Sequence, residues 1–104
     1  MTLENVKQLA YRYKAALIKN NIPVDSIYLF GSYAKGKQRL GSDIDFCVVS
    51  KIFGKNDFRE MVLINQIAKR IASQIEAFPV SEKELKARNN PFITEALKTG
   101  TRMA

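Results

Sequence analysis

The sequence predicts an α/β (α+β) domain in which helices pack on one face of a small mixed β-sheet. Three short apolar runs have the length and residue types of strands. Longer segments with helical apolar spacing precede the first run and separate the second from the third. The chain has 104 residues, of which 46% are hydrophobic, so it can form a single core. We therefore expect one domain over residues 1–104, with the helices covering the sheet.

The first element is predicted to be a helix over residues 3–20. Apolar side chains recur there at intervals of three and four, which places them on one side of a helix. They are Leu3, Val6, Ala10, Tyr13 and Leu17. Thr2 is a suitable N-cap, and Pro23 follows the end of the helix. The apolar run 27–30 then predicts the first strand.

A glycine and a serine follow this strand, and they predict a sharp turn into a short helix beginning near residue 32. Gly31 allows a positive φ angle and close approach of the backbone. Ser32 can cap the helix, whose free N–H groups attract phosphate, and Lys35 lies one turn further on. The alternative is an ordinary turn with a capping serine. The loop 36–42 carries two cations, which either neutralise a bound triphosphate or are simply solvated. They are Lys37 and Arg39.

The second strand is predicted over residues 44–50, and two aspartates stand at its start. Side chains alternate along a strand, so Asp43 and Asp45 point to the same side with Cα atoms about 7 Å apart. Two converging carboxylates repel each other unless a cation lies between them, and Mg²⁺ prefers oxygen ligands. The alternative is a pair of solvated aspartates at a turn.

A second long helix is predicted over residues 57–73, with a broad apolar side that we interpret as core packing. Its members are Phe58, Met61, Val62, Ile64, Ile67, Ala68 and Ile71. The run 74–80 predicts a third strand, in which Glu76 is the only charged residue. A lone charge in an apolar run is at an open edge or has a partner. Pro79 cannot donate to a β-ladder, which indicates that the strand frays there or lies at an edge.

Two further helices are predicted near the end of the chain. Ser81 and Glu84 have the spacing of a capping box that opens a short helix. A last helix is expected over 92–98, ending at Gly100.

Composition excludes several classes of function. The sequence has no histidine, which excludes Ser-His and Cys-His catalytic sites and most zinc sites. Its one cysteine, Cys47, is expected to be a buried apolar residue in a protein of the reducing cytoplasm. No stretch reaches the length of a membrane span. The net charge of +7 would attract polyanions, but the sequence shows no motif of alternating aromatic and basic residues, so we do not expect nucleic-acid binding.

The order and spacing of these features resemble a known family. Gly31-Ser32, ten intervening residues and then Asp43-x-Asp45 are similar to the signature of the polymerase-β-like nucleotidyltransferases. The strings Phe-Gly-Ser-Tyr-Ala-Lys-Gly and Ser-Asp-Ile-Asp-Phe resemble its short branch, the minimal nucleotidyltransferases. Two departures stand out. Lys35 occupies a position that is commonly Arg, and Ala77-Phe78 stands where the branch often has Pro-His.

The resemblance implies a nucleotidyltransferase palm fold and a specific set of site residues. Asp43, Asp45 and Glu76 would be catalytic and would hold two Mg²⁺ ions. The nucleotide, ATP, would bind at Gly31, Ser32 and Lys35. The implied reaction transfers AMP from ATP to a hydroxyl, that of a tyrosine, on a HEPN-type toxin, so that the protein acts as an antitoxin.

Two other functions remain open from the sequence. One is an antitoxin that neutralises its toxin by binding alone. The other is a nucleotidyltransferase for a small molecule, of the aminoglycoside-modifying type, acting as a dimer. The chain has no second domain for an acceptor, so we expect a homodimer or a hetero-oligomer with the toxin.

Overall fold

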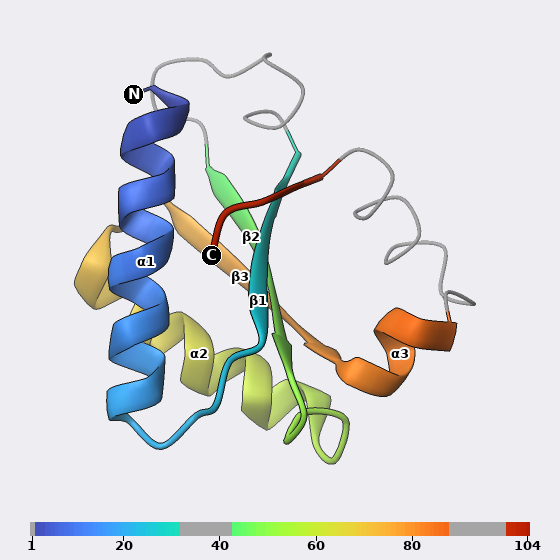
Figure 1. Ribbon diagram of the computed structural model, residues 1–104. Coiled ribbons are helices and arrows are strands. Elements are labelled where there is room, and N and C mark those ends of the chain that lie inside the picture. The colour runs from blue at the N-terminus through green and yellow to red at the C-terminus, as the bar shows by residue number, and fades with distance from the viewer. Residues whose placement is uncertain (1, 32–42, 88–99) are drawn as a thin grey trace.

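The computed structural model describes residues 2–31, 43–87 and 100–104 (Figure 1). Its elements in chain order are α1 (Leu3–Lys19), β1 (Ser26–Phe30), β2 (Ile44–Ser50), α2 (Asp57–Ile71), β3 (Ile75–Ser81), α3 (Glu82–Ala87) and β4 (Thr101–Arg102). The predicted helices at the positions of α1 and α2 and the three predicted strands are therefore confirmed, with ends that differ by one or two residues. The helices expected near residue 32 and over 92–98 lie outside the described residues.

The described strands form one four-stranded sheet in the order β3-β2-β1-β4. β1 is antiparallel to both β2 and β4, whereas β2 and β3 are parallel. The expectation of a mixed sheet is confirmed. β3 lies at one edge, as Pro79 indicated, because a proline in a central strand would remove a ladder hydrogen bond.

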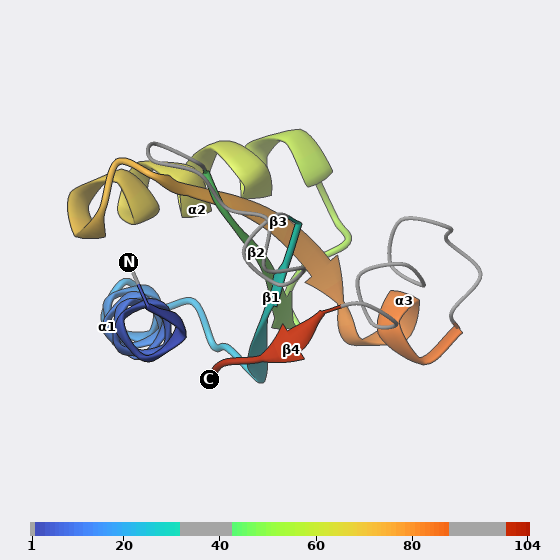
Figure 2. The same ribbon diagram turned by 90° about the horizontal axis from the view of Figure 1, so that it is seen from above.

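Helices α1 and α2 cover one face of the sheet and enclose the main core (Figure 2). Tyr13 joins the two helices and the sheet. Its hydroxyl donates to the main-chain oxygen of Ile64 at 2.6 Å, and its ring stacks on Phe46 with centroids 6.2 Å apart. Burial raises the pKa of Tyr13, so the hydroxyl stays a donor. This bond satisfies a polar group that would otherwise be costly to bury.

The third helix, α3, packs against the opposite face of the sheet. Leu85 lies there on a smaller apolar cluster of Cys47, Val49 and Val80. The expectation that helices occupy one face thus holds for α1 and α2 only. The predicted capping box at the start of α3 is confirmed, because Ser81 Oγ accepts from the Glu84 N–H at 3.0 Å and the Glu84 carboxylate faces Ser81 in return.

The interpretation of the whole apolar side of α2 as core packing was wrong. Ile64, Ile67 and Ala68 are buried, but Phe58 is 79% exposed and Val62 is 41% exposed. Met61 is likewise exposed at 37%. An α-helix that packs on a sheet buries only the stripe that faces the sheet, and the apolar residues of α2 extend beyond that stripe.

The C-terminal strand β4 was not predicted. It has only two residues, Thr101 and Arg102, both exposed, so it carries no apolar pattern. The residues that follow it are buried, and Met103 N donates to the Ile27 carbonyl at 2.8 Å. This pairing places the end of the chain beside β1 and α1 (Figures 1 and 2). None of the helices among the described residues is long and apolar enough to cross a membrane.

Candidate active site

Two of the three predicted catalytic carboxylates stand side by side on parallel strands. Asp45 of β2 is paired in register with Glu76 of β3. Residues paired in this way project to the same face of a sheet, so the two carboxylates share a face. Asp43 lies just before β2 and is exposed. The sequence alone did not fix this register, and a slip of one residue would have sent Glu76 to the other face.

The three carboxylates interact electrostatically at this end of the sheet. Partial burial raises the pKa of Asp45, and the negative charges of Asp43 and then Glu76 raise it further. Each of these causes disfavours the ionised form. Asp45 therefore lies in a region of negative potential, which a bound cation would stabilise.

The turn after β1 lies against the same carboxylate. Phe30 at the end of β1 is paired with Asp45, and the next residue, Gly31, has a φ of +77°. A Cβ atom at Gly31 would lie 2.3 Å from Asp45 Oδ2. Glycine suits this position because its backbone angle is rarely adopted by other residues and because a side chain here would have to displace the Asp45 carboxylate.

Glu76 has a second neighbour that sequence reasoning did not find. Lys69 Nζ, from the last turn of α2, lies 3.7 Å from Glu76 Oε2. The same ammonium donates to the main-chain oxygens of Ser73, at 3.0 Å, and Ile75. Lys69 is therefore tied to the start of β3, next to the acidic residues. A lysine in the last turn of a helix is common, so the sequence offered no signal for this role.

The donor chemistry of this site fits Mg²⁺, since carboxylate oxygens are its preferred protein ligands. However, no group of three or more Asp, Glu or Cys side chains among residues 2–31, 43–87 and 100–104 is arranged to hold one ion. Glu76 forms an ion pair with Lys69 in this structure, so a bound cation would compete with Lys69 for its carboxylate.

The other predicted nucleotide-binding residues lie outside the described residues. These are Ser32 and Lys35, together with the loop cations Lys37 and Arg39. Their roles stay predictions.

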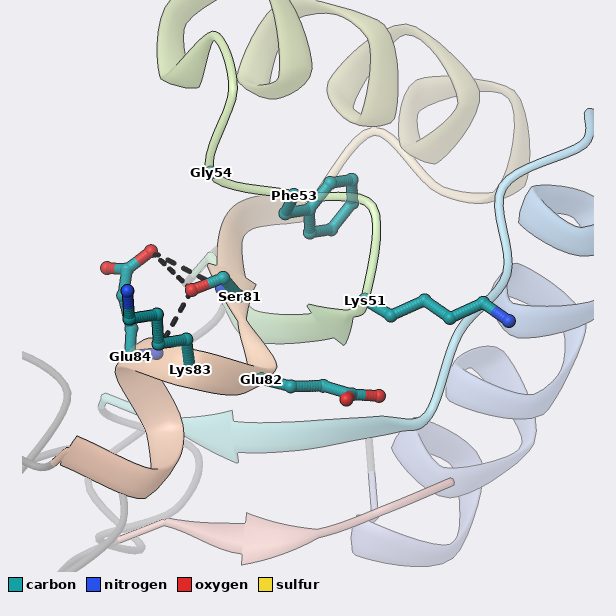
Figure 3. A pocket seen from close by; sticks show the side chains of 7 residues that line it. All are labelled: Lys51, Phe53, Gly54, Ser81, Glu82, Lys83 and Glu84. Carbon is teal, nitrogen blue, oxygen red and sulfur yellow. Dashed lines mark hydrogen bonds between the residues drawn. The ribbon is translucent and has the colours of Figure 1, made fainter.

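A separate pocket of about 490 Å³ lies at the opposite end of β2 and β3 (Figure 3). It is lined by Lys51, Phe53, Gly54, Ser81, Glu82, Lys83 and Glu84. Its two lysines and two glutamates balance in charge, and the side chain of Ser81 is engaged with Glu84. None of the predicted site residues lines this pocket.

Cys47 lies between these two ends of β2 and has no reactive character. It is buried, as expected, and burial followed by the nearby charge of Glu84 raises the pKa of its thiol to about 12. The thiolate that reacts with electrophiles or metals is therefore scarce at neutral pH.

Comparison with known proteins agrees with the geometry. Residues 14–104 match the family model described as polymerase beta, nucleotidyltransferase, and this range includes Gly31 and all three carboxylates. The chain belongs to this family of nucleotidyltransferases.

One relative supports the same assignment, and one solved structure shares the fold. The chain is 30% identical over 98 residues to MJ1379 of Methanocaldococcus jannaschii, which is named as a protein adenylyltransferase. The match covers 93% of this chain and 92% of that protein. The fold is similar to a crystal structure from Sulfolobus solfataricus described as a nucleotidyltransferase, with a TM-score of 0.65, 24% identity and coverage of 92% of this chain and 77% of that one.

A third similarity is to a crystal structure described as a toxin-antitoxin with AMP-PNP. The TM-score is 0.59 and the identity 25%, and the match covers 89% of this chain and 71% of the other.

Proposed function

We propose that this nucleotidyltransferase transfers AMP from ATP to a hydroxyl group, that of a tyrosine, on a HEPN-type toxin and thereby acts as an antitoxin. The observation that carries the proposal is the pairing of Asp45 with Glu76 beside Gly31. The name of MJ1379 favours a protein acceptor, and the toxin-antitoxin neighbour with AMP-PNP favours a toxin and an adenine nucleotide.

In the proposed reaction the acceptor hydroxyl oxygen attacks the α-phosphorus of ATP. A new bond forms between that oxygen and phosphorus, and the bond from phosphorus to the pyrophosphate oxygen breaks. Pyrophosphate leaves, and the hydroxyl proton passes to Glu76. A carboxylate within reach of the attacking hydroxyl can accept its proton as a general base.

Asp43 and Asp45 would hold Mg²⁺, with Glu76 as a third oxygen donor toward the second of two ions. When bound, Mg²⁺ neutralises the charge that develops on the triphosphate. Gly31, Ser32 and Lys35 would bind the β- and γ-phosphates. Gly31 has no side chain, which leaves room for the Asp45 carboxylate and would let the backbone approach a phosphate closely.

The test is intact-mass measurement of the protein and its toxin after incubation with Mg²⁺ and each nucleoside triphosphate in turn. We expect the toxin to gain the mass of one AMP, with ATP only. Asp43→Asn and Asp45→Asn should abolish the gain while the two proteins still bind each other.

No mass gain on either protein would contradict the proposal. Neutralisation of the toxin by the Asp43→Asn/Asp45→Asn variant would show that binding alone suffices. We place this reaction in the cytoplasm, the setting that the single buried thiol favours.

A further inference from the structure

A second candidate site lies between α1 and the C-terminal end of the chain, in a groove of about 390 Å³. The residues that line it are Lys7, Tyr11, Lys14, Arg102, Met103 and Ala104. We call it the α1–β4 groove. Figures 1 and 2 both show the end of the chain beside α1, and β4 joins the sheet next to β1.

Three residues of the groove form one row along α1. Lys7, Tyr11 and Lys14 are separated by four and three positions, so they stand above one another on the helix surface. Each directly follows a buried residue in the sequence, which places the row at the border between the core and solvent. At about 1.5 Å per residue, the two lysines are about 10 Å apart along the helix axis, with the tyrosine between them.

Tyr11 differs sharply from the other tyrosine of α1. Tyr13 is completely buried and hydrogen-bonded, whereas Tyr11 is 54% exposed. The ring of Tyr11 therefore contributes little to the core and is accessible from the groove. An exposed aromatic ring alone is unremarkable, but this ring lies in a row of cations.

The fourth polar residue, Arg102, is fixed in position by the main chain. Its Nε donates to the Ala104 carbonyl at 3.2 Å, and its Nη2 donates to the Asp25 carbonyl at 3.4 Å. A guanidinium has five N–H donors, and these two bonds use two of them. Arg102 can therefore keep its place and still bind an anion.

Charge separates this groove from two other pockets that are lined by described residues. The pocket beside α3 has two lysines and two glutamates, and a pocket of about 430 Å³ on α2 is apolar apart from Arg59 and Gln66. The α1–β4 groove has three cationic side chains and no acidic one among the residues that line it. Its occupant should be an anion.

We propose that the α1–β4 groove binds single-stranded nucleic acid, with a base stacked on Tyr11 and the backbone phosphates beside Lys7, Lys14 and Arg102. Sites for single strands combine a cationic groove with an aromatic ring on which a base stacks. An acidic protein segment would use the cations but has no use for the ring. The central position of Tyr11 therefore favours the nucleic acid.

This inference does not depend on the proposed transfer reaction, because none of the carboxylates or Gly31 lines the groove. It departs from the expectation, made from the sequence, that the protein does not bind nucleic acid. Arg102 lies far along the chain from Lys7, and only the pairing of β4 with β1 brings them together.

The test uses fluorescence anisotropy of a labelled single-stranded RNA oligonucleotide with the full chain, without nucleotide or metal. We expect Tyr11→Ala to weaken binding about tenfold and Tyr11→Phe to leave it nearly unchanged, because stacking needs only the ring. Lys7→Ala/Lys14→Ala should also weaken it about tenfold and reduce the dependence of affinity on salt, measured between about 50 and 200 mM.

The matched control is Lys55→Ala/Lys86→Ala, which removes the same two charges from exposed positions away from the groove. It should change the affinity less than twofold, and circular dichroism should show that all variants are folded. An equal loss in this control would mean that net charge alone attracts the RNA, and would overturn the proposal.

Two more results would overturn it. One is wild-type affinity in Tyr11→Ala, together with competition by polyglutamate, which would identify an acidic protein segment as the ligand. The other is an RNA duplex that binds as tightly as the single strand, because paired bases cannot stack on the ring.

Discussion

Gly31 lies against the carboxylate of Asp45 so closely that a Cβ atom on the glycine would be 2.3 Å from Asp45 Oδ2. The contact joins the turn after β1 to the start of β2, the two features that identified the family in the sequence. It explains physically why a glycine stands at the end of one strand when an aspartate pair stands at the start of the next.

Gly31→Ala should therefore harm both stability and transfer. The φ of +77° alone should cost about 1–2 kcal/mol of the free energy of unfolding, measured by urea denaturation. The Cβ would also push the Asp45 side chain aside, so AMP transfer should fall by much more than the loss of folded protein explains.

Gly54→Ala is a suitable comparison for this prediction. Gly54 also has a positive φ, of +106°, but a Cβ there would meet Ser81 Cβ at 3.4 Å, an ordinary contact. Its variant should lose similar stability and keep transfer. Equal loss of transfer in both variants would show that backbone strain, and not the contact with Asp45, causes the effect.

Asp45 should give the metal-free protein a characteristic dependence of stability on pH. Its pKa in the folded state is raised, so the folded protein binds this proton more tightly than the unfolded chain does. The resulting stabilisation is complete below the unfolded pKa, near 4, and is lost as the pH rises through the folded pKa.

In Asp45→Asn the free energy of unfolding should no longer fall as the pH rises through this range. Urea denaturation at a series of pH values measures this dependence. Above the folded pKa the variant should be at least as stable as the wild type. A variant that is less stable there, without Mg²⁺, would mean that the Asp45 carboxylate is stabilised in the folded state and that burial and repulsion are not the dominant influences.

The sequence was sufficient to predict the strands because their apolar runs are short, β-branched and bounded by turns. It was also sufficient to place Asp43 and Asp45 on one side of a strand, since alternation is a local property. The prediction that Asp45 and Glu76 lie close together also needed the resemblance to the family, because the register between two strands is set by contacts distant in sequence.

Features that depend on tertiary contacts alone were not predictable. β4 has two exposed residues and no pattern, and only its pairing with β1 defines it. Lys69 meets Glu76 because the turn between α2 and β3 brings the helix end back to the strand. The exposure of Phe58 depends on which stripe of α2 contacts the sheet, and helical periodicity shows that an apolar side exists but not how wide the contact is.

The burial of Ile64 and the exposure of Phe58 can be tested by two substitutions in α2. Phe58→Ser should change the free energy of unfolding by no more than about 0.5 kcal/mol, because the side chain is largely solvated already. Ile64→Ala should cost about 2–5 kcal/mol, because Ile64 is fully buried. Urea denaturation of both variants measures the difference. A large loss of stability in Phe58→Ser would show that this side chain contributes to the core.

The pairing of Lys69 with Glu76 leads to the last prediction. Both side chains are about half exposed, at 46% and 49%, so the ion pair itself should contribute no more than about 1 kcal/mol. The ion pair nevertheless keeps the Lys69 ammonium next to the site proposed for Mg²⁺. Lys69→Met should free Glu76 and remove a positive charge, so the affinity for Mg²⁺, measured by isothermal titration calorimetry, should rise about two- to fivefold.

Lys86→Met, an exposed lysine on α3, is the matched control and should leave the affinity for Mg²⁺ unchanged. This experiment tests two proposals separately: that the carboxylates bind Mg²⁺, and that Lys69 competes with the ion. If the wild type binds no Mg²⁺, the proposed metal site is wrong. If the wild type binds and Lys69→Met binds equally or more weakly, then Lys69 does not compete with the ion, and its bonds to the Ser73 and Ile75 carbonyls are its main contribution.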